Sequence, residues 1–148
     1  MSVILGGCHC GNISYIAEFR HDLASYAPRA CDCGFCSSHG ALYASDSGGR
    51  LKISVNDLEQ FSRYRQGSGI ADFLICKNCG VMTGVCYEES GRVYGTINVR
   101  STAEPALFGE GRAARLAQLS DSERVGRWKS VWFPDVEFEY GKGALAGS

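Results

Sequence analysis

Seven of the eight cysteines in this chain fall into three short clusters. The outer two clusters are pairs and the central one is a triplet: Cys8 and Cys10; Cys31, Cys33 and Cys36; Cys76 and Cys79. A zinc ion takes four ligands in a tetrahedron, so the two pairs together can complete one site. The triplet needs a fourth ligand from elsewhere, and three protein ligands beside an open position are typical of catalytic zinc. The clusters therefore predict two unequal metal sites.

A chain of 148 residues can form a core without cross-links. At that length about 68–70 % of the unfolded surface is buried on folding, which fits a single domain over residues 1–148 with a frayed tail at 141–148. The start, Met1 to Gly7, has no basic segment and only a short apolar run, which argues against an export signal. We therefore expect a cytoplasmic protein, because a reducing environment disfavours the alternative of a secreted disulfide framework.

Composition and charge argue against two classes of partner. No segment approaches the ~18 apolar residues of a membrane span. The formal net charge is −1 with the cysteines counted as neutral. Seven ligating thiolates would add seven negative charges and two divalent ions would add four positive ones, which gives a net charge of about −4 for the metal-bound protein. An acidic metal-bound protein is not expected to bind nucleic acid, because binding requires Lys and Arg side chains that neutralise the phosphates of the nucleic acid. The densest basic run in the sequence is only Arg63-Tyr64-Arg65.

Alternating apolar residues predict strands throughout the first hundred positions. Four segments show this period: Ile13–Phe19, Leu51–Val55, Ala71–Ile75 and Val93–Val99. Glycine-containing turns separate these runs. Many short strands joined by such turns are typical of antiparallel sheets. We therefore expect a mainly β fold of packed antiparallel sheets with little helix.

The later part of the chain has weaker patterns. Good helix formers at 112–119 predict a short helix. Residues 61–64 fit either a helix or a strand. The aromatic stretch 128–140 is expected to form an apolar flap over the core or a wall of the site, and the charged run 121–124 to be a solvated face.

The outer cysteine pairs have spacings that suit chelation. Cys76 and Cys79 are separated by two residues, so a tight turn can direct both sulfurs at one ion, and Gly80 allows the chain to turn after them. Cys8 and Cys10 would share one face of an extended strand while the residue between them, His9, faces outward. Together the four form a candidate structural zinc site.

The central triplet has two candidates for a fourth ligand. Cys86 is the remaining cysteine, and its apolar neighbours favour a small buried core residue instead. His39 lies three residues after Cys36. If its imidazole reaches the metal, the site is a closed structural one; if not, water or a substrate thiolate can occupy the fourth position. An iron–sulfur cluster is a further alternative, although grouping into four and three suits zinc better.

The cysteine segments resemble one known family. The matching segments are Gly7-Cys8-His9-Cys10-Gly11, Cys31-Asp32-Cys33-Gly34-Phe35-Cys36, Gly40-Ala41-Leu42, Cys76-Lys77-Asn78-Cys79-Gly80-Val81 and Ile97-Asn98-Val99-Arg100. They are similar to the GFA family, which groups glutathione-dependent formaldehyde-activating enzymes with centromere protein V. The order and spacing of all seven clustered cysteines agree, over roughly residues 6–100.

This resemblance implies a β-tent fold and a zinc-dependent carbon–sulfur lyase. It implies a structural zinc on Cys8, Cys10, Cys76 and Cys79, and a second, more labile zinc on Cys31, Cys33 and Cys36. In the family's founding activity, glutathione adds through sulfur to formaldehyde and gives S-hydroxymethylglutathione. The implied partner is a small thiol such as glutathione, or its adduct with a small aldehyde. A zinc on the triplet could take that thiol as its fourth ligand and lower its pKa.

Two departures from the family pattern bear on the substrate. Residues 82–84 are Met-Thr-Gly where the family often has a histidine followed by aromatic or apolar residues, and His39 replaces a residue that is commonly basic or small and polar. Arg100 is a candidate for holding a substrate carboxylate, with an ordinary surface arginine as the alternative. The alternative function is a non-catalytic zinc-binding module with two structural sites that serves a protein partner, and closure of the second site by His39 would favour it.

Overall fold

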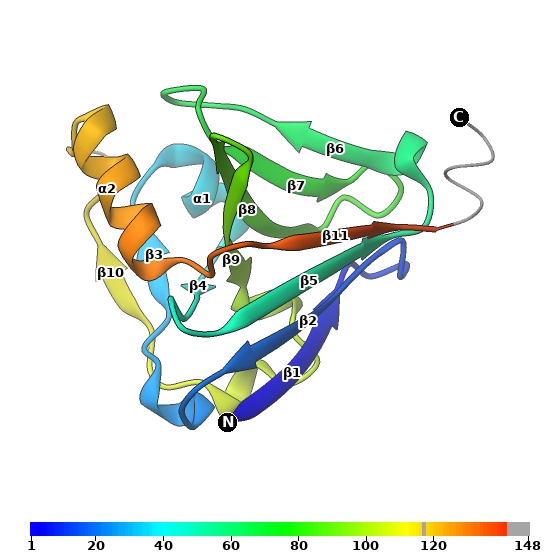
Figure 1. The fold of residues 1–148 in the computed structure, drawn as a ribbon, viewed down its shortest axis with the longest axis horizontal. Helices are drawn as coiled ribbons and strands as arrows, with labels where there is room; N and C mark the ends of the chain where they lie inside the picture. Colours follow the sequence, from blue (N-terminus) through cyan, green and yellow to red (C-terminus); the bar gives the residue numbers. More distant parts are fainter. Residues whose placement is uncertain (117, 142–148) are drawn as a thin grey trace.

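The computed structural model describes residues 1–116 and 118–141, and these form two β-sheets (Figure 1). The smaller sheet has the order β1 (Ser2–Gly7), β2 (Ile13–Phe19), β5 (Arg50–Val55), β11 (Glu137–Tyr140). The larger sheet has the order β10 (Arg112–Ala114), β3 (Arg29–Cys31), β4 (Tyr43–Ala44), β9 (Arg92–Asn98), β8 (Met82–Glu89), β7 (Asp72–Cys76), β6 (Phe61–Tyr64). Neighbouring strands are antiparallel except in the pairs β10–β3 and β11–β5. The prediction of a mainly β fold of antiparallel sheets is confirmed.

Helices are few in the described residues. The α-helices are α1 (Gly34–His39) and α2 (Asp121–Val131), and the 3₁₀ turns are η1 (Leu23–Ser25), η2 (Leu58–Gln60), η3 (Val99–Ser101) and η4 (Pro105–Leu107). Both α-helices lie near β3 and β10, at one end of the larger sheet (Figure 1). Within the described ranges, no helix has the length and apolar character required to cross a membrane.

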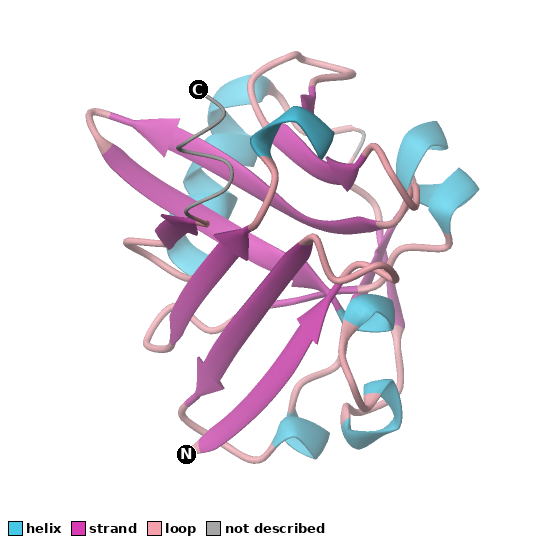
Figure 2. Cartoon of the chain, turned by 90° about the vertical axis from the view of Figure 1, so that its right-hand side faces the viewer, coloured by secondary structure: helices cyan, strands magenta, loops and turns pink. Residues whose placement is uncertain are grey.

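The alternating sequence pattern explains how the smaller sheet covers the core. In β2 the odd positions are buried, with Ile13, Ala17 and Phe19 all 0 % exposed. Tyr15 and Ala17 pair across to the apolar residues of β5, so the inward faces of the two strands coincide. Figure 2 shows the strands of this sheet lying side by side. All four strand segments predicted from periodicity are strands, with bounds that differ by one or two residues at most.

Phe133, which follows α2 in the sequence, connects the two sheets. Its backbone exchanges hydrogen bonds with Gly95 of β9, at 2.9 and 3.0 Å, and its fully buried ring packs edge-on against Phe19 with centroids 5.1 Å apart. A Cβ at Gly95 would lie 3.0 Å from the Val136 side chain and 3.2 Å from the Cys86 sulfur, so glycine at this position relieves tight packing against these two side chains. Core residues from both sheets therefore pack into one cluster.

The helix predicted at 112–119 is wrong. Residues 112–114 form β10, which pairs in parallel with β3, because this strand pairing outweighs the local helix propensity. The helix begins later, where Ser120 and Glu123 form a capping box: the Ser120 hydroxyl accepts from the Glu123 amide at 3.2 Å, and the Glu123 carboxylate accepts from the Ser120 amide at 2.9 Å. The run 121–124 is thus the solvated first turn of α2. Residues 61–64 are strand β6, and of the tail 141–148 only Gly141 is among the described residues.

Candidate metal centres and an adjoining cavity

The four outer cysteines meet at one point of the fold. Their sulfur atoms all lie within 4.8 Å of one another. The Sγ–Sγ distance is 3.7 Å between Cys8 and Cys10 and 3.6 Å between Cys10 and Cys76. A tetrahedron with zinc–sulfur bonds of about 2.3 Å has edges of about 3.8 Å. Cys8, Cys10, Cys76 and Cys79 therefore could hold one metal ion, and their spacing fits tetrahedral thiolate coordination.

A tight turn after β1 brings Cys8 and Cys10 together. The Cys8 amide donates to the Ile13 carbonyl at 2.9 Å, and Gly7 packs so closely on that carbonyl that a Cβ would overlap it. The expectation that the two cysteines share an extended strand is wrong, because β1 ends at Gly7. The turn places both sulfurs at the same ion position, while His9 is exposed as predicted.

A second turn supplies the other pair. Cys76 ends β7 and Cys79 lies in the connection to β8. The Cys76 amide donates to the Val81 carbonyl at 3.0 Å, and the Gly80 amide donates back to the Cys76 carbonyl at 2.8 Å. Gly80 has φ 81°, in the left-handed region that favours glycine. The glycine after the pair therefore closes the turn, as the sequence indicates.

Burial and hydrogen bonding shift the pKa values of Cys8 and Cys10 in opposite directions. Burial raises the pKa of Cys8 to about 12, although the Ile13 amide donates to its sulfur at 3.2 Å. Hydrogen bonds from the Asn78 side chain and the Asn12 backbone lower the pKa of Cys10 to about 6. A bound cation would displace the remaining protons, because metal-ligating cysteines are thiolates.

The central triplet comes from β3 and α1. Cys31 is the last residue of β3, Cys33 caps α1, and Cys36 lies in its first turn. The three sulfurs lie within 4.8 Å of one another and could hold a metal ion. The Cys33 sulfur accepts from the Cys36 amide at 3.3 Å, so one hydrogen bond caps the helix and fixes the triplet.

Two neutral side chains contact the triplet sulfurs. The Tyr43 hydroxyl lies 3.2 Å from the Cys36 sulfur, and the Gln66 amide donates to the Cys33 sulfur at 3.8 Å. Burial raises the pKa of Tyr43, so its phenol is neutral at physiological pH. A hydrogen bond with Cys36 lowers the pKa of Cys31 to about 6, and the same bond raises the pKa of Cys36.

His39 and Cys86 do not belong to the group formed by the triplet. The imidazole of His39 is exposed at the end of α1 and packs on Phe35, with ring centroids 4.5 Å apart. Cys86 is a buried core residue, as predicted, and burial raises its pKa to about 12. Arg100 donates to the Gly40 carbonyl at 2.6 Å. Of the two candidates for a fourth ligand, the structure thus brings neither into the group of three sulfurs.

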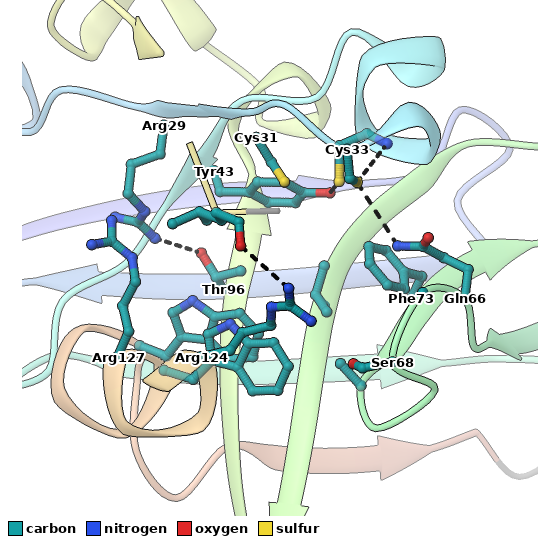
Figure 3. Close-up of a pocket in the computed structure, with 17 residues that line it drawn as sticks. Arg29, Cys31, Cys33, Tyr43, Gln66, Ser68, Phe73, Thr96, Arg124 and Arg127 are labelled. Carbon is teal, nitrogen blue, oxygen red and sulfur yellow. Dashed lines mark hydrogen bonds between the residues drawn. The ribbon is translucent and has the colours of Figure 1, made fainter. Parts of the chain in front are cut away.

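A cavity of about 280 Å³ adjoins the triplet (Figure 3). Cys31, Cys33 and Cys36 line it, and the stacked rings of Trp128 and Trp132, with centroids 4.9 Å apart, form an apolar wall. The prediction that the 128–140 stretch forms a wall of the site holds for these two tryptophans. The four-cysteine group lies outside this cavity. The two groups therefore differ in what surrounds them.

Three arginines also line the cavity: Arg29, Arg124 and Arg127. Burial, together with the nearby charge of Arg127, lowers the pKa of Arg29 to about 10, so Arg29 still carries its proton at neutral pH. None of the three was identified from the sequence. Arg124 and Arg127 are three residues apart and so share a face of α2, which is a weak signal, whereas Arg29 reaches the cavity only through the pairing of β3.

Fold and site together define a β-rich protein with two cysteine groups able to hold metal ions. No family model and no curated protein sequence matches the chain. Among solved structures, it is similar to a crystal structure of a Rhodobacter sphaeroides protein that was a structural genomics target. The identity is 27 %, the TM-score is 0.53, and the match covers 74 % of this chain and 99 % of that one. This likeness supports the fold and carries no activity.

Proposed function

We propose that the chain is a zinc-dependent carbon–sulfur lyase of the GFA type. In this proposal the four outer cysteines hold a structural zinc and the triplet holds the reacting one. The substrate is the adduct of a small thiol, glutathione-like in its chemistry, with a small aldehyde such as formaldehyde. In the direction of addition, the thiol S–H bond and the carbonyl π bond break while an S–C bond and an O–H bond form, so atoms and electrons balance.

One observation carries this proposal: the triplet has three sulfurs and borders a cavity, whereas the outer group already has four. The donor set of each group fits zinc, because thiolate is a usual zinc ligand. In the four-cysteine group the sulfur–sulfur distances also suit a tetrahedron. Cys31, Cys33 and Cys36 would hold a zinc through three thiolates, and the chemistry that it would supply is a lowered pKa for a substrate thiol. His39 is exposed and does not belong to the group, which favours an open position over a closed structural site.

The residues around the triplet have roles in this reaction. Three thiolates exceed the charge of one divalent ion, so donors to sulfur moderate the excess negative charge. Tyr43 and Gln66 supply such donors at Cys36 and Cys33. Trp128 and Trp132 exclude water from one side of the cavity, where a reacting carbonyl would otherwise be hydrated.

The test uses exchange between a thiol and its S-hydroxymethyl adduct, followed by NMR above the uncatalysed rate. We expect Cys33→Ser to lose one of two zinc ions and the accelerated exchange while it keeps its fold, because only two sulfurs of the triplet remain. Cys86→Ala is the matched control, since it removes a cysteine outside both groups and should keep both ions and the activity. A folded Cys33→Ser protein with one zinc and full activity would rule out the proposal.

A further inference from the structure

Arg29 and Arg127 place two positive charges on one side of the cavity, and Figure 3 shows the triplet on the other side. Both side chains line this one cavity, and Figure 3 draws them next to each other. No acidic side chain in the described ranges forms an ion pair with either arginine. Two neighbouring guanidinium groups without a carboxylate repel each other, so the arrangement favours an anion between them.

The partners of Arg29 hold its guanidinium in place without neutralising it. Its Nη2 donates to the Ser45 hydroxyl at 3.0 Å and to the Thr96 hydroxyl at 3.3 Å. Both hydroxyl groups are buried, and each gives its own proton to a carbonyl: Ser45 to Val131 at 2.7 Å and Thr96 to Ala44 at 2.8 Å. Each hydroxyl is therefore locked as an acceptor. The guanidinium is fixed by neutral groups, and its full positive charge remains for a ligand.

Arg127 differs from its neighbour Arg124 on the same helix face. Arg124 is occupied by the protein, because it donates to the carbonyls of Leu116 and Leu119 at 3.2 Å each and lies 3.7 Å from the Asp121 carboxylate. Arg127 lines the cavity without such contacts among the described residues. Trp128 follows it in the sequence and supplies the apolar wall. The open cation is thus Arg127, beside a surface that suits a short apolar segment of a ligand.

We infer that Arg29 and Arg127 form an oxyanion-binding subsite, which takes a carboxylate or phosphate group of the molecule whose other end reaches the cysteine triplet. This inference rests on the proposed function for the identity of that other end. It defines the substrate class as an acidic thiol or its aldehyde adduct, and it places neutral and cationic thiols among the poor substrates. Loss of a charge-assisted hydrogen bond at such a site weakens binding by about tenfold or more.

The test measures binding by calorimetry with the zinc-loaded full chain. The probes are 3-mercaptopropionate, its neutral counterpart 2-mercaptoethanol, and two anions that lack a thiol, propionate and inorganic phosphate. We expect 3-mercaptopropionate to bind at least tenfold more tightly than 2-mercaptoethanol, and Arg127→Gln to abolish that difference. The tighter of propionate and phosphate identifies the oxyanion. Arg50→Gln is the control, because Arg50 is an exposed residue of the smaller sheet.

The outcomes separate the subsite from the lyase. If the thiol-free anion binds and Arg127→Gln removes that binding, the subsite stands whether or not exchange activity is found. If the wild-type protein accelerates exchange but binds the acidic and neutral thiols equally, the lyase stands and the subsite is wrong. Arg29→Gln repeats the binding test at the other arginine of the subsite. If the Arg29 variant does not fold, Arg127→Gln alone decides whether the subsite exists, because Arg127 lies on α2 with intermediate exposure.

Discussion

Replacing Asp46 with asparagine should destabilise the protein substantially at neutral pH. The Asp46 side chain is only 2 % exposed and accepts from the Arg20 guanidinium at 2.7 and 3.0 Å, the Arg20 amide and Tyr26 hydroxyl at 2.8 Å, and the Gly48 amide at 3.0 Å. This network fixes the segment after β4, next to Ser45, which holds Arg29. The substitution keeps the shape of the side chain and removes its charge.

The magnitude follows from the exposure of each partner. Asparagine keeps one acceptor oxygen, so it loses only the bonds made to the other: those from the Arg20 amide and the Tyr26 hydroxyl at Oδ2, or those from the Gly48 amide and the Arg20 guanidinium at Oδ1. A hydrogen bond to a charged acceptor contributes about 1.5 kcal/mol. The Arg20 side chain is 53 % exposed and can return to water, so its ion pair contributes no more than about 1 kcal/mol. The loss is therefore about 3 kcal/mol for either orientation of the amide, which corresponds to a decrease in Tm of about 6–12 °C for a chain of this size.

The same network gives the loss a pH dependence. Burial acts to raise the pKa of Asp46, but the hydrogen bonds from Arg20, Gly48 and Tyr26 outweigh it and hold that pKa well below its usual range. Because the folded-state pKa is lowered, the stabilisation is present above the ordinary carboxyl pKa of about 3.9 and is lost as the pH falls below it. The difference in Tm between wild type and Asp46→Asn should therefore narrow between about pH 5 and pH 3.

The assay is thermal unfolding followed by circular dichroism from pH 3 to pH 7. Asp135→Asn is the matched control, because the Asp135 carboxylate also pairs with an arginine but its side chain is 69 % exposed, so little change in Tm is expected. A Tm for Asp46→Asn within about 2 °C of wild type at pH 7, or a difference that widens in acid, would refute this reasoning.

Two further predictions concern backbone geometry and helix capping. A Cβ at Gly84 would lie 2.5 Å from the Thr96 carbonyl oxygen in the paired strand, so Gly84→Ala should reduce the free energy of unfolding in urea by about 1–3 kcal/mol; Gly126→Ala, which meets open space in α2, should raise it by up to about 1 kcal/mol. Equal effects of the two alanines would contradict the packing at Gly84. Ser120→Ala should cost about 1 kcal/mol by the same measurement, because the Glu123 amide loses its acceptor, and an unchanged stability would show that the capping box contributes nothing.

The predictable parts of the fold are those with a local cause. The strand at Ile13–Phe19 could be predicted because a half-buried strand requires a period of two. The triplet and each outer pair of cysteines could be predicted because short spacings bring their sulfurs together, whereas the meeting of the two outer pairs depends on the fold. The prediction of a helix at 112–119 is wrong because helix propensity contains no information on the pairing of residues 112–114 with β3. The start of α2 does have a local sequence signal, the capping box Ser120-x-x-Glu123, but it overlaps the charged run 121–124, which by its charge indicates only a solvated face.

The arginine side of the site could not be predicted. Arg29 reaches the cavity through β3, and Arg127 through a helix almost a hundred residues later, so no spacing in the sequence connects them. Their significance comes from the lack of a carboxylate partner within residues 1–116 and 118–141, which is a property of the folded arrangement. Ser45 and Thr96 act as hydrogen-bond acceptors for Arg29 because each hydroxyl donates its own proton to a backbone carbonyl, and only the packed structure determines which carbonyls those are.

The most direct test is the zinc content per chain by elemental analysis, before and after mild chelation, with a parallel thermal melt. We predict two zinc ions, one of which is removed by mild chelation while the protein keeps its cooperative unfolding transition, because the triplet borders a cavity and the four-cysteine group is complete in itself. Two ions that are both retained until the protein unfolds would contradict an open second site and favour a non-catalytic module.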